Sequence, residues 1–201
     1  GAIENGTLLI VDGRIAAVGV ALQIPQQARR IDARGKVVTP GLFNSLTGLG
    51  VVEVSAVEAS ADGVVKSDRV TAAFDVADAI NPRSTLIAVN RIEGLTRAVV
   101  APSAGNSLIA GRGAVIHLGV TADLVVRARV AMFASLGERG AELAGGARGA
   151  AMLRLREALQ DAADFAAHRQ AFDSGGRRDY SLSRLDLEAL APVASGELVL
   201  A

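Results

Sequence analysis

The chain has 201 residues, half of them hydrophobic, which is the composition of a folded protein with one or two domains. Lysine and arginine number 21, as do aspartate and glutamate, so the basic surface of a nucleic-acid-binding protein is not expected. The absence of cysteine excludes disulfides and thiolate metal sites. No apolar run approaches the roughly 20 residues of a membrane-spanning helix, so no membrane association is expected.

The first forty residues carry the pattern of short strands. Two apolar runs within residues 7–19 flank Asp12-Gly13, a pair typical of type I′ turns because both positions need positive φ, and we predict a β-hairpin. Residues 28–40 predict two further short strands with a turn at Gly35. We therefore expect a small antiparallel sheet, and such a sheet needs packing partners to be stable.

After Pro40, predicted strands alternate with predicted helices. Short strands are expected within residues 41–46 and 96–102, and two more within residues 106–119, on either side of a Gly-Arg-Gly sequence. The stretches 70–80 and 84–94 are helical or irregular by their composition. Strands separated by helices are typical of parallel βα units, so we predict an α/β fold.

The C-terminal third begins with a long helical region, residues 140–172, whose start Gly145-Gly146 should delay. Apolar residues recur there at steps of three and four: Met152, Leu155, Leu159, Ala162 and Ala166. This spacing predicts one apolar face, which should need a barrel wall to cover it. Ser183 should cap a short helix over residues 184–193. The apolar run 197–201 is another candidate strand, and because the chain stops within it we expect the chain to be incomplete.

Three segments carry a resemblance to a known family. The first is NGTLLIVDGRIAAVG followed by IDARGKVVTPGLFNS, the second is TRAVVAPSAGNSLIAGRGAVIHL, and the third is LEALAPVASGELVLA. They resemble, in that order, the N-terminus, the second barrel strand with its Gly-rich sequel, and a later helix and strand of the amidohydrolase superfamily. The resemblance is to the imidazolonepropionase-like members in particular.

The resemblance implies both a fold and an activity. Residues 1–39 would form part of a small β-sandwich and residues 40–201 an incomplete, partial TIM-like barrel, an α/β fold. The activity would be hydrolysis of a carbon–nitrogen bond other than a peptide bond, in a small-molecule substrate. The alternative is a non-catalytic homologue that serves as a binding or scaffold subunit.

An incomplete barrel and sandwich imply partners. The missing C-terminal half would be a second polypeptide or would be left out of this sequence, and the protein would be an oligomer. Lys36 and Lys66 are the only lysines, a skew towards arginine that suggests a GC-rich bacterial genome, with the cytoplasm and the periplasm both open.

The family binds one or two divalent metals, and a His-x-His pair at the end of the first barrel strand supplies two of the ligands. Leu46 and Gly48 occupy those positions here, so the resemblance implies a degenerate metal site. We expect no metal in this part of the protein, although the complete protein could hold a divalent metal such as zinc. Of the two histidines, His117 is expected to be a hydrogen-bonded structural residue and His168 a solvated residue of the long helix.

Three polar residues are candidates for substrate binding: Thr47, Ser103 and Asn106. Ser103 and Asn106 follow a strand that should end at the carboxyl face of the barrel, where the functional loops of this fold gather. Thr47, or its neighbours Asn44 and Ser45, would lie at the barrel mouth. The competing interpretations are an ordinary packed strand for the residues near Thr47 and turn formation for the other two. No catalytic residue can be named from the sequence.

Overall fold

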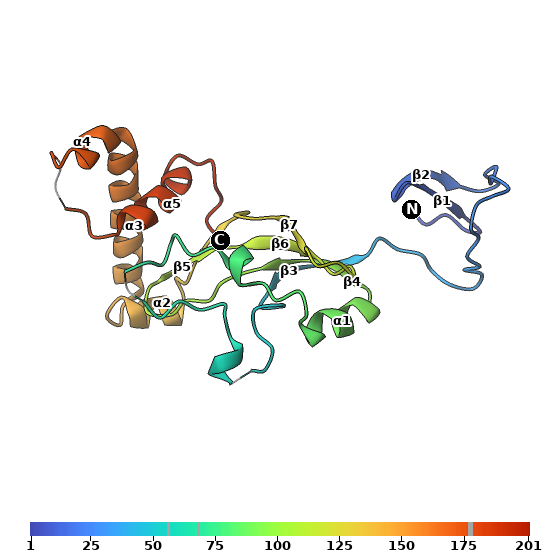
Figure 1. Cartoon of the computed structure of the whole chain (residues 1–201), viewed down its shortest axis with the longest axis horizontal. Helices are drawn as coiled ribbons and strands as arrows, with labels where there is room; N and C mark the ends of the chain where they lie inside the picture. The colour runs from blue at the N-terminus through green and yellow to red at the C-terminus, as the bar shows by residue number, and fades with distance from the viewer. Residues whose placement is uncertain (56, 68, 177–178) are drawn as a thin grey trace. The chain divides into compact units, whose positions relative to one another are not determined.

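The computed structural model describes residues 1–55, 57–67, 69–176 and 179–201. The chain forms two compact units, residues 1–40 and residues 41–201 (Figure 1). Among the described residues, no helix combines the length and the apolar character needed to cross a membrane.

The N-terminal unit contains the predicted hairpin. Strands β1 (Thr7–Val11) and β2 (Arg14–Gly19) pair antiparallel, with an irregularity between Leu9 and Ile10. Asp12 and Gly13 both have positive φ, 50° and 72°, which is the backbone conformation that the Asp-Gly pair predicts. None of residues 1–40 is buried, as expected for a two-stranded sheet without a packing partner.

The prediction of two strands within residues 28–40 is wrong. The turn is present, since Gly35 has a φ of 73° and the Lys36 N–H donates to the Ala33 carbonyl at 3.0 Å. The residues on either side of the turn are not paired with any strand of the described chain. An extended segment becomes a strand only when a neighbour satisfies its backbone groups, and sequence pattern alone does not reveal that neighbour.

The second unit is built on a four-stranded sheet with the order β3-β4-β6-β7. Strand β3 (Leu42–Thr47), helix α1 (Thr85–Ile92) and strand β4 (Leu95–Val100) form the predicted parallel βα unit. Strands β6 (Ala114–His117) and β7 (Val125–Arg127) continue the sheet in antiparallel pairing. The unit is therefore mixed α/β, and its sheet is only partly parallel.

A second, two-stranded sheet pairs β5 (Ile109–Arg112) with β8 (Met132–Ala134). The two strands predicted around the Gly-Arg-Gly sequence are thus confirmed, but they lie in different sheets. The apolar C-terminal run continues this pairing, because the Ala201 N–H donates to the Met132 carbonyl at 2.8 Å and Leu200 forms a parallel bridge with Met132. Short 3-10 helices η1 (Glu58–Ser60) and η2 (Val76–Ala79) lie in the connection between β3 and α1.

The predicted long helical region consists of three helices: α2 (Glu138–Leu143), α3 (Arg148–Ala167) and α4 (Arg169–Asp173). Gly145 and Gly146 separate the first two, with φ of 95° and 101°, values that a helix cannot contain. Helix α5 (Arg184–Ala194) follows, and the predicted cap is confirmed because the Ser183 hydroxyl oxygen accepts from the Asp186 N–H at 3.1 Å.

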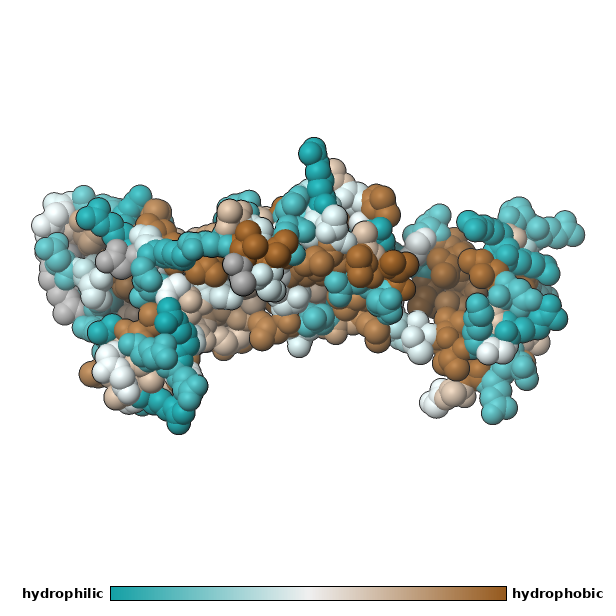
Figure 2. Space-filling view, turned by 90° about the horizontal axis from the view of Figure 1, so that it is seen from below, coloured by the Kyte–Doolittle hydropathy of each residue, from teal (hydrophilic) through white to brown (hydrophobic). Residues whose placement is uncertain are grey.

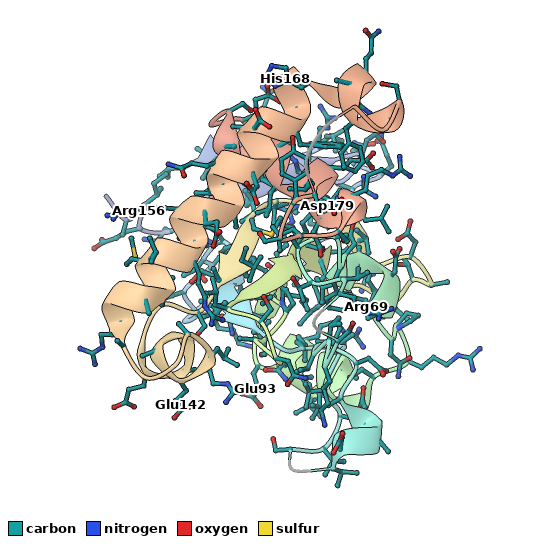
Figure 3. The ribbon with its side chains drawn as sticks, turned by 90° about the vertical axis from the view of Figure 1, so that its left-hand side faces the viewer. Arg69, Glu93, Glu142, Arg156, His168 and Asp179 are labelled. Atoms are coloured by element: carbon teal, nitrogen blue, oxygen red, sulfur yellow. The ribbon has the colours of Figure 1, made fainter. Side chains whose placement is uncertain are left out.

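The buried face of α3 differs from the predicted one. The buried apolar residues are Ala151, Leu155, Ala158, Ala162 and Phe165. Met152 is 39% exposed and Ala166 is also exposed, so two of the five predicted positions are wrong. Helix α5 packs against α3 and selects this face (Figure 3). The apolar face of α3 is therefore covered within the same chain, by α5 together with residues of β5 and β8.

Two hydrophobic clusters stabilise this unit. One joins α3 and α5 to β5 and β8 through residues such as Ile109, Met132 and Leu187. The other lies between the four-stranded sheet and α1, with Ile87, Val100 and Ile116 at its centre. A pocket opens where the two sheets approach each other at the ends of β3 and β4.

Candidate functional site

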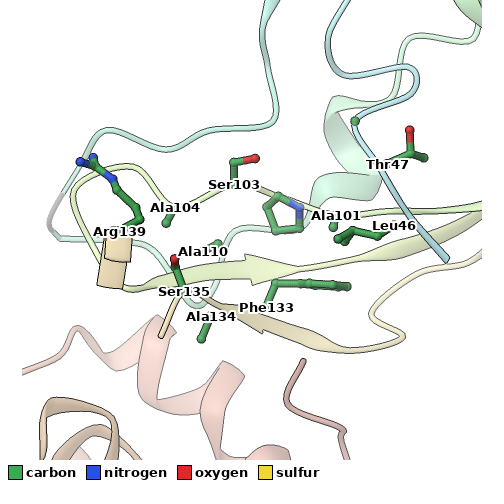
Figure 4. Close-up of a pocket in the computed structure, with 12 residues that line it drawn as sticks. Leu46, Thr47, Ala101, Ser103, Ala104, Ala110, Phe133, Ala134, Ser135 and Arg139 are labelled. Carbon is green, nitrogen blue, oxygen red and sulfur yellow. The ribbon is translucent and has the colours of Figure 1, made fainter. Parts of the chain in front are cut away.

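The pocket lies at the carboxyl ends of β3 and β4 and has a volume of about 490 Å³ (Figure 4). The end of β3 contributes residues 46–48 and the segment after β4 contributes residues 101–104. Residues 133–135 come from the end of β8, and Arg139 comes from α2. The ends of the two parallel strands are joined by the Ala101 N–H, which donates to the Thr47 carbonyl at 3.0 Å.

Two of the three predicted site residues line this pocket. Thr47 and Ser103 are brought together because parallel strands end at the same edge of a sheet. The Thr47 Oγ1 accepts from the Leu49 N–H at 3.2 Å, which leaves the hydroxyl hydrogen for another acceptor. The Ser103 N–H donates to the Gly63 carbonyl at 2.9 Å, so the backbone of this loop residue is anchored.

Asn106 does not line the pocket. It is exposed, and its side-chain amide donates to the Lys66 carbonyl. This hydrogen bond joins the loop after β4 to Lys66, so the side chain of Asn106 has a structural role. A substrate contact by Asn106 stays a prediction.

Leu46 and Gly48, at the positions of the expected histidine pair, both line the pocket. Neither has a side chain that can bind a metal, and the other lining residues include no histidine, cysteine, aspartate or glutamate. Nor do the described residues elsewhere contain a group of three or more such side chains that could hold a metal ion. The residues of this pocket therefore do not fit the metal centre that the resemblance implies.

The two histidines lie outside the pocket. The His117 Nδ1 accepts from the Gly119 N–H at 3.0 Å, and its Nε2 lies 3.1 Å from the Asp123 carbonyl, so both ring nitrogens are used. The prediction of a hydrogen-bonded structural histidine is confirmed. His168 lies at the carboxyl end of α3 (Figure 3), half-exposed, with its Nδ1 3.1 Å from the Asp164 carboxylate.

Arg139, Phe133 and Ser135 are pocket residues that sequence reasoning missed. Ser135 directly follows a strand, the same signal that identified Ser103. That strand has three residues, too few to be recognised by alternation. Arg139 is positioned by a hydrogen bond from its Nη2 to the Gly105 carbonyl, 34 residues away, and α2 begins close against Ser135, since a Cβ on Gly140 would lie 1.9 Å from the Ser135 carbonyl oxygen. No local pattern predicts that approach.

A separate charged cluster joins Asp75, Arg112 and Arg129. The Arg129 Nε donates to the buried Asp75 carboxylate at 2.7 Å, and the Arg112 Nη2 donates to the Ala73 carbonyl at 2.7 Å. Burial lowers the pKa of the Arg112 guanidinium, the charge of Arg129 lowers it further, and Asp75 acts in the opposite direction. The cluster ties β5 and the loop before β8 to the segment around η2, and none of its residues lines the pocket.

Comparison with known proteins gives three likenesses, although no family model matches the chain. The crystal structure of an amidohydrolase from Thermotoga maritima MSB8 matches with a TM-score of 0.77 and 20% identity, over 92% of this chain and 50% of that one. An imidazolonepropionase from Geobacillus sp. (strain WCH70) is 46% identical over 52 residues, which are 22% of this chain and 12% of that protein. A protein named a deacetylase, from Agrobacterium fabrum, is 49% identical over 43 residues, 20% of this chain and 11% of that protein.

The solved structure establishes a shared fold, and the two curated proteins carry amidohydrolase-superfamily names. The resemblance to that superfamily is therefore confirmed. The chain spans about half the length of the solved relative and matches about a tenth of each curated relative.

Proposed function

We propose, from this likeness to amidohydrolases, that the chain is the N-terminal part of a hydrolase that acts on carbon–nitrogen bonds other than peptide bonds. Within that protein the chain supplies the substrate-binding part of the site, and other residues supply the catalytic groups. Thr47 and Ser103 are the proposed substrate contacts of this part. A divalent metal, if the complete protein uses one, is held by residues outside this pocket.

The proposal includes a finer description of the fold. Residues 40–201 form the first strands of a TIM-like barrel, and residues 1–39 form part of a small β-sandwich. The barrel is supported by the parallel strands β3 and β4 and the crossover helix α1 between them, because a strand followed by a helix is the repeating unit of such barrels. The exposed hairpin supports the second, because it needs further strands to bury its apolar side chains.

One observation carries the functional proposal. The pocket lies at the carboxyl ends of two adjacent parallel strands, the place where α/β barrels bind their substrates. It is lined there by hydroxyl groups and small or apolar side chains, which can orient a small molecule. It contains no side chain able to act as a general acid or base near neutral pH, so binding is the role that these residues can fill.

The exposed edge of the four-stranded sheet supports the proposal that another polypeptide segment pairs with it. Strand β3 pairs with β4 on one side and with no described strand on the other. Its side chains Leu42, Phe43 and Leu46 are 59%, 55% and 63% exposed. Figure 2 shows that hydrophobic residues reach the surface of the chain in several places. An apolar edge strand of this kind invites pairing with another segment. That segment belongs to the remaining half of the hydrolase, on the same or a separate polypeptide.

A second candidate function is favoured by the absence of metal ligands at Leu46 and Gly48. In this alternative the chain belongs to a non-catalytic amidohydrolase homologue, a binding or scaffold subunit. The same pocket would then bind a molecule without transforming it.

The test compares the chain alone with the assembly in which it occurs. The purified chain, assayed on small cyclic amides and N-acetylated amines with and without added zinc, should show no turnover. The assembly isolated under native conditions from cells that produce the chain should hydrolyse one of these classes. Thr47→Val and Ser103→Ala, introduced into that assembly, should raise KM several-fold and leave metal content unchanged.

The outcomes separate the two candidates. Turnover by the chain alone would contradict the assignment of the catalytic groups to other residues. An assembly with neither turnover nor bound metal would favour the non-catalytic homologue. Variants with unchanged KM would show that this pocket does not contact the substrate.

A further inference from the structure

The four-stranded sheet has one covered face and one open face. Side chains alternate between the two faces along each strand. Four residues of β4 and β6 point to the covered face and are fully buried: Ala98, Val100, Ala114 and Ile116. They belong to the hydrophobic cluster that includes Ile87 of α1. The residues that alternate with them therefore point to the opposite face.

The open face consists of two rows of residues, one across β3, β4 and β6 and one across β4, β6 and β7. Residues directly opposite each other on neighbouring strands share a face, so the strand register identifies the rows. Their residues are, in strand order, Phe43, Arg97 and His117, then Val99, Val115 and Arg127.

This open face is accessible to solvent. Phe43 is 55% exposed, and Arg97 and Arg127 are exposed as well. Val99 and Val115 are only partly buried, and neither belongs to the two hydrophobic clusters that the described residues form. The face thus offers apolar surface that neither cluster uses.

The open face is also positively charged. Within the described part of the chain, neither Arg97 nor Arg127 has an ion pair or a side-chain hydrogen bond. His117 uses both ring nitrogens for backbone groups, so it offers the face no further donor. None of the six residues is an aspartate or a glutamate. The two arginines lie on either side of β6 with their Cα atoms roughly 12 Å apart, so one partner segment can reach both.

These two properties restrict what can cover the open face. Burial of Phe43, Val99 and Val115 favours an apolar partner. A wholly apolar partner would take both guanidinium groups out of water without a counter-charge, and an unpaired buried charge is strongly unfavourable. A partner with carboxylates as well as apolar side chains satisfies both requirements, because charge-assisted hydrogen bonds then replace the lost water.

We propose that the open face is the docking surface for the remaining half of the hydrolase, and that this half places carboxylates against Arg97 and Arg127. The inference rests on the proposed function, since it names the chemistry of the partner segment described there. The open face is continuous with the exposed edge of the sheet, because Phe43 belongs to both. The polypeptide that pairs with β3 is therefore placed to cover the open face as well.

A matched pair of peptides tests the chemistry of the face on the chain alone. One peptide alternates valine with glutamate and the other alternates valine with glutamine, so they differ in charge and keep a similar shape. Binding is measured by NMR chemical-shift titration of the backbone amides of β4, β6 and β7. The glutamate peptide should bind about tenfold more tightly than the glutamine peptide, the scale of one charge-assisted hydrogen bond. Its affinity should fall as salt is raised.

Three variants locate this effect. Arg97→Gln and Arg127→Gln should each reduce the preference for the glutamate peptide, and the double variant should abolish it. Arg83→Gln should keep the full preference, because Arg83 is exposed just before α1, which packs on the covered face. Thermal unfolding of each variant shows that the comparison is made on folded protein.

Carbodiimide cross-linking of the native assembly identifies the source of the carboxylates. Arg97→Lys places a primary amine on the open face. Carbodiimide joins an amine to an adjacent carboxylate as an amide, and the reagent takes up the water and becomes a urea. Mass spectrometry should find this amide between position 97 and an aspartate or glutamate outside residues 1–201. Arg83→Lys, treated in the same way, should give no cross-link to that residue.

The outcomes distinguish this inference from the function on which it rests. Equal binding of the two peptides overturns the acidic character of the partner, and no binding of either overturns the docking surface. Cross-links that stay within residues 1–201 overturn the assignment to the remaining half. An assembly that hydrolyses its substrate without the expected cross-link keeps the proposed function and loses this inference, whereas a cross-linked assembly without turnover does the reverse.

Discussion

The carboxylate of Asp186 accepts a hydrogen bond from the backbone N–H of Thr71, across 115 positions of sequence, at 2.9 Å. The same oxygen accepts from the Ala73 N–H at 2.8 Å, and the other carboxylate oxygen accepts from the Ser183 hydroxyl at 2.9 Å. Asp186 is 1% exposed. One buried side chain of α5 thus holds the segment that leads into η2, and this segment in turn pairs with β5, since the Arg112 N–H donates to the Phe74 carbonyl at 2.8 Å.

We predict that Asp186→Ala destabilises the chain by about 3 kcal/mol, because it leaves three donors, one buried and two partly buried, without an acceptor. Asp186→Asn should be milder, since it keeps one oxygen for the two backbone donors. Chemical denaturation measures both. The control is Glu197→Ala, which removes an exposed carboxylate and should change the free energy of unfolding by less than about 0.5 kcal/mol. Equal effects of Ala at 186 and 197 would show that the buried contacts do not form.

The close packing of α2 on the end of β8 gives a second prediction. Gly140→Ala should cost about 1–3 kcal/mol, because the added Cβ would lie 1.9 Å from the Ser135 carbonyl oxygen and must push the two apart. In an ordinary helix the same change stabilises. Gly149→Ala in α3 is the matched control: its Cβ meets nothing within 4 Å, and the variant should be unchanged or up to about 1 kcal/mol more stable. Thermal unfolding of the pair checks the sign of each effect, and a stabilised Gly140→Ala would refute the packing.

The face of α3 that packs on α5 can be tested with two neighbouring residues. Leu155 is 4% exposed and Met152 39%, although the sequence pattern assigns both to the same face. Leu155→Ala should therefore destabilise by about 2–5 kcal/mol and Met152→Ala by less than about 1 kcal/mol. Denaturant titration of both variants decides the register. A larger effect at 152 than at 155 would mean that the face predicted from sequence is the buried one.

The chain by itself should hold no metal tightly. The pocket residues at the expected ligand positions are Leu46 and Gly48, and both nitrogens of His117 are used in hydrogen bonds. Elemental analysis after dialysis against a weak chelator should find well under one zinc ion per chain. A Leu46→His, Gly48→His double variant is the informative comparison, because it restores two imidazoles at the same end of the pocket and should raise zinc retention. Stoichiometric zinc in the unaltered chain would contradict the prediction and point to ligands that the pocket geometry does not show.

Several elements could be predicted from short stretches because their causes are local. The hairpin follows from Asp12-Gly13, whose backbone preferences depend on two residues. The start of α5 follows from Ser183, whose hydroxyl reaches an N–H three positions later. The placement of Thr47 and Ser103 at one edge is nearly as local, since it needs only two strands running in the same direction.

The sequence by itself thus determined the local elements and the resemblance to amidohydrolases, while the tertiary structure decided which surfaces meet. Helical spacing allows more than one face of α3 to be buried, and only the packing of α5 selects Leu155 over Met152. Arg139 likewise lies at the pocket through its hydrogen bond to the Gly105 carbonyl, 34 residues away, a contact that no periodicity predicts. The physical reason is the same in both cases. A turn or a cap is stabilised by neighbours along the chain, whereas a buried face or a pocket is stabilised by whatever residues lie across from it in space.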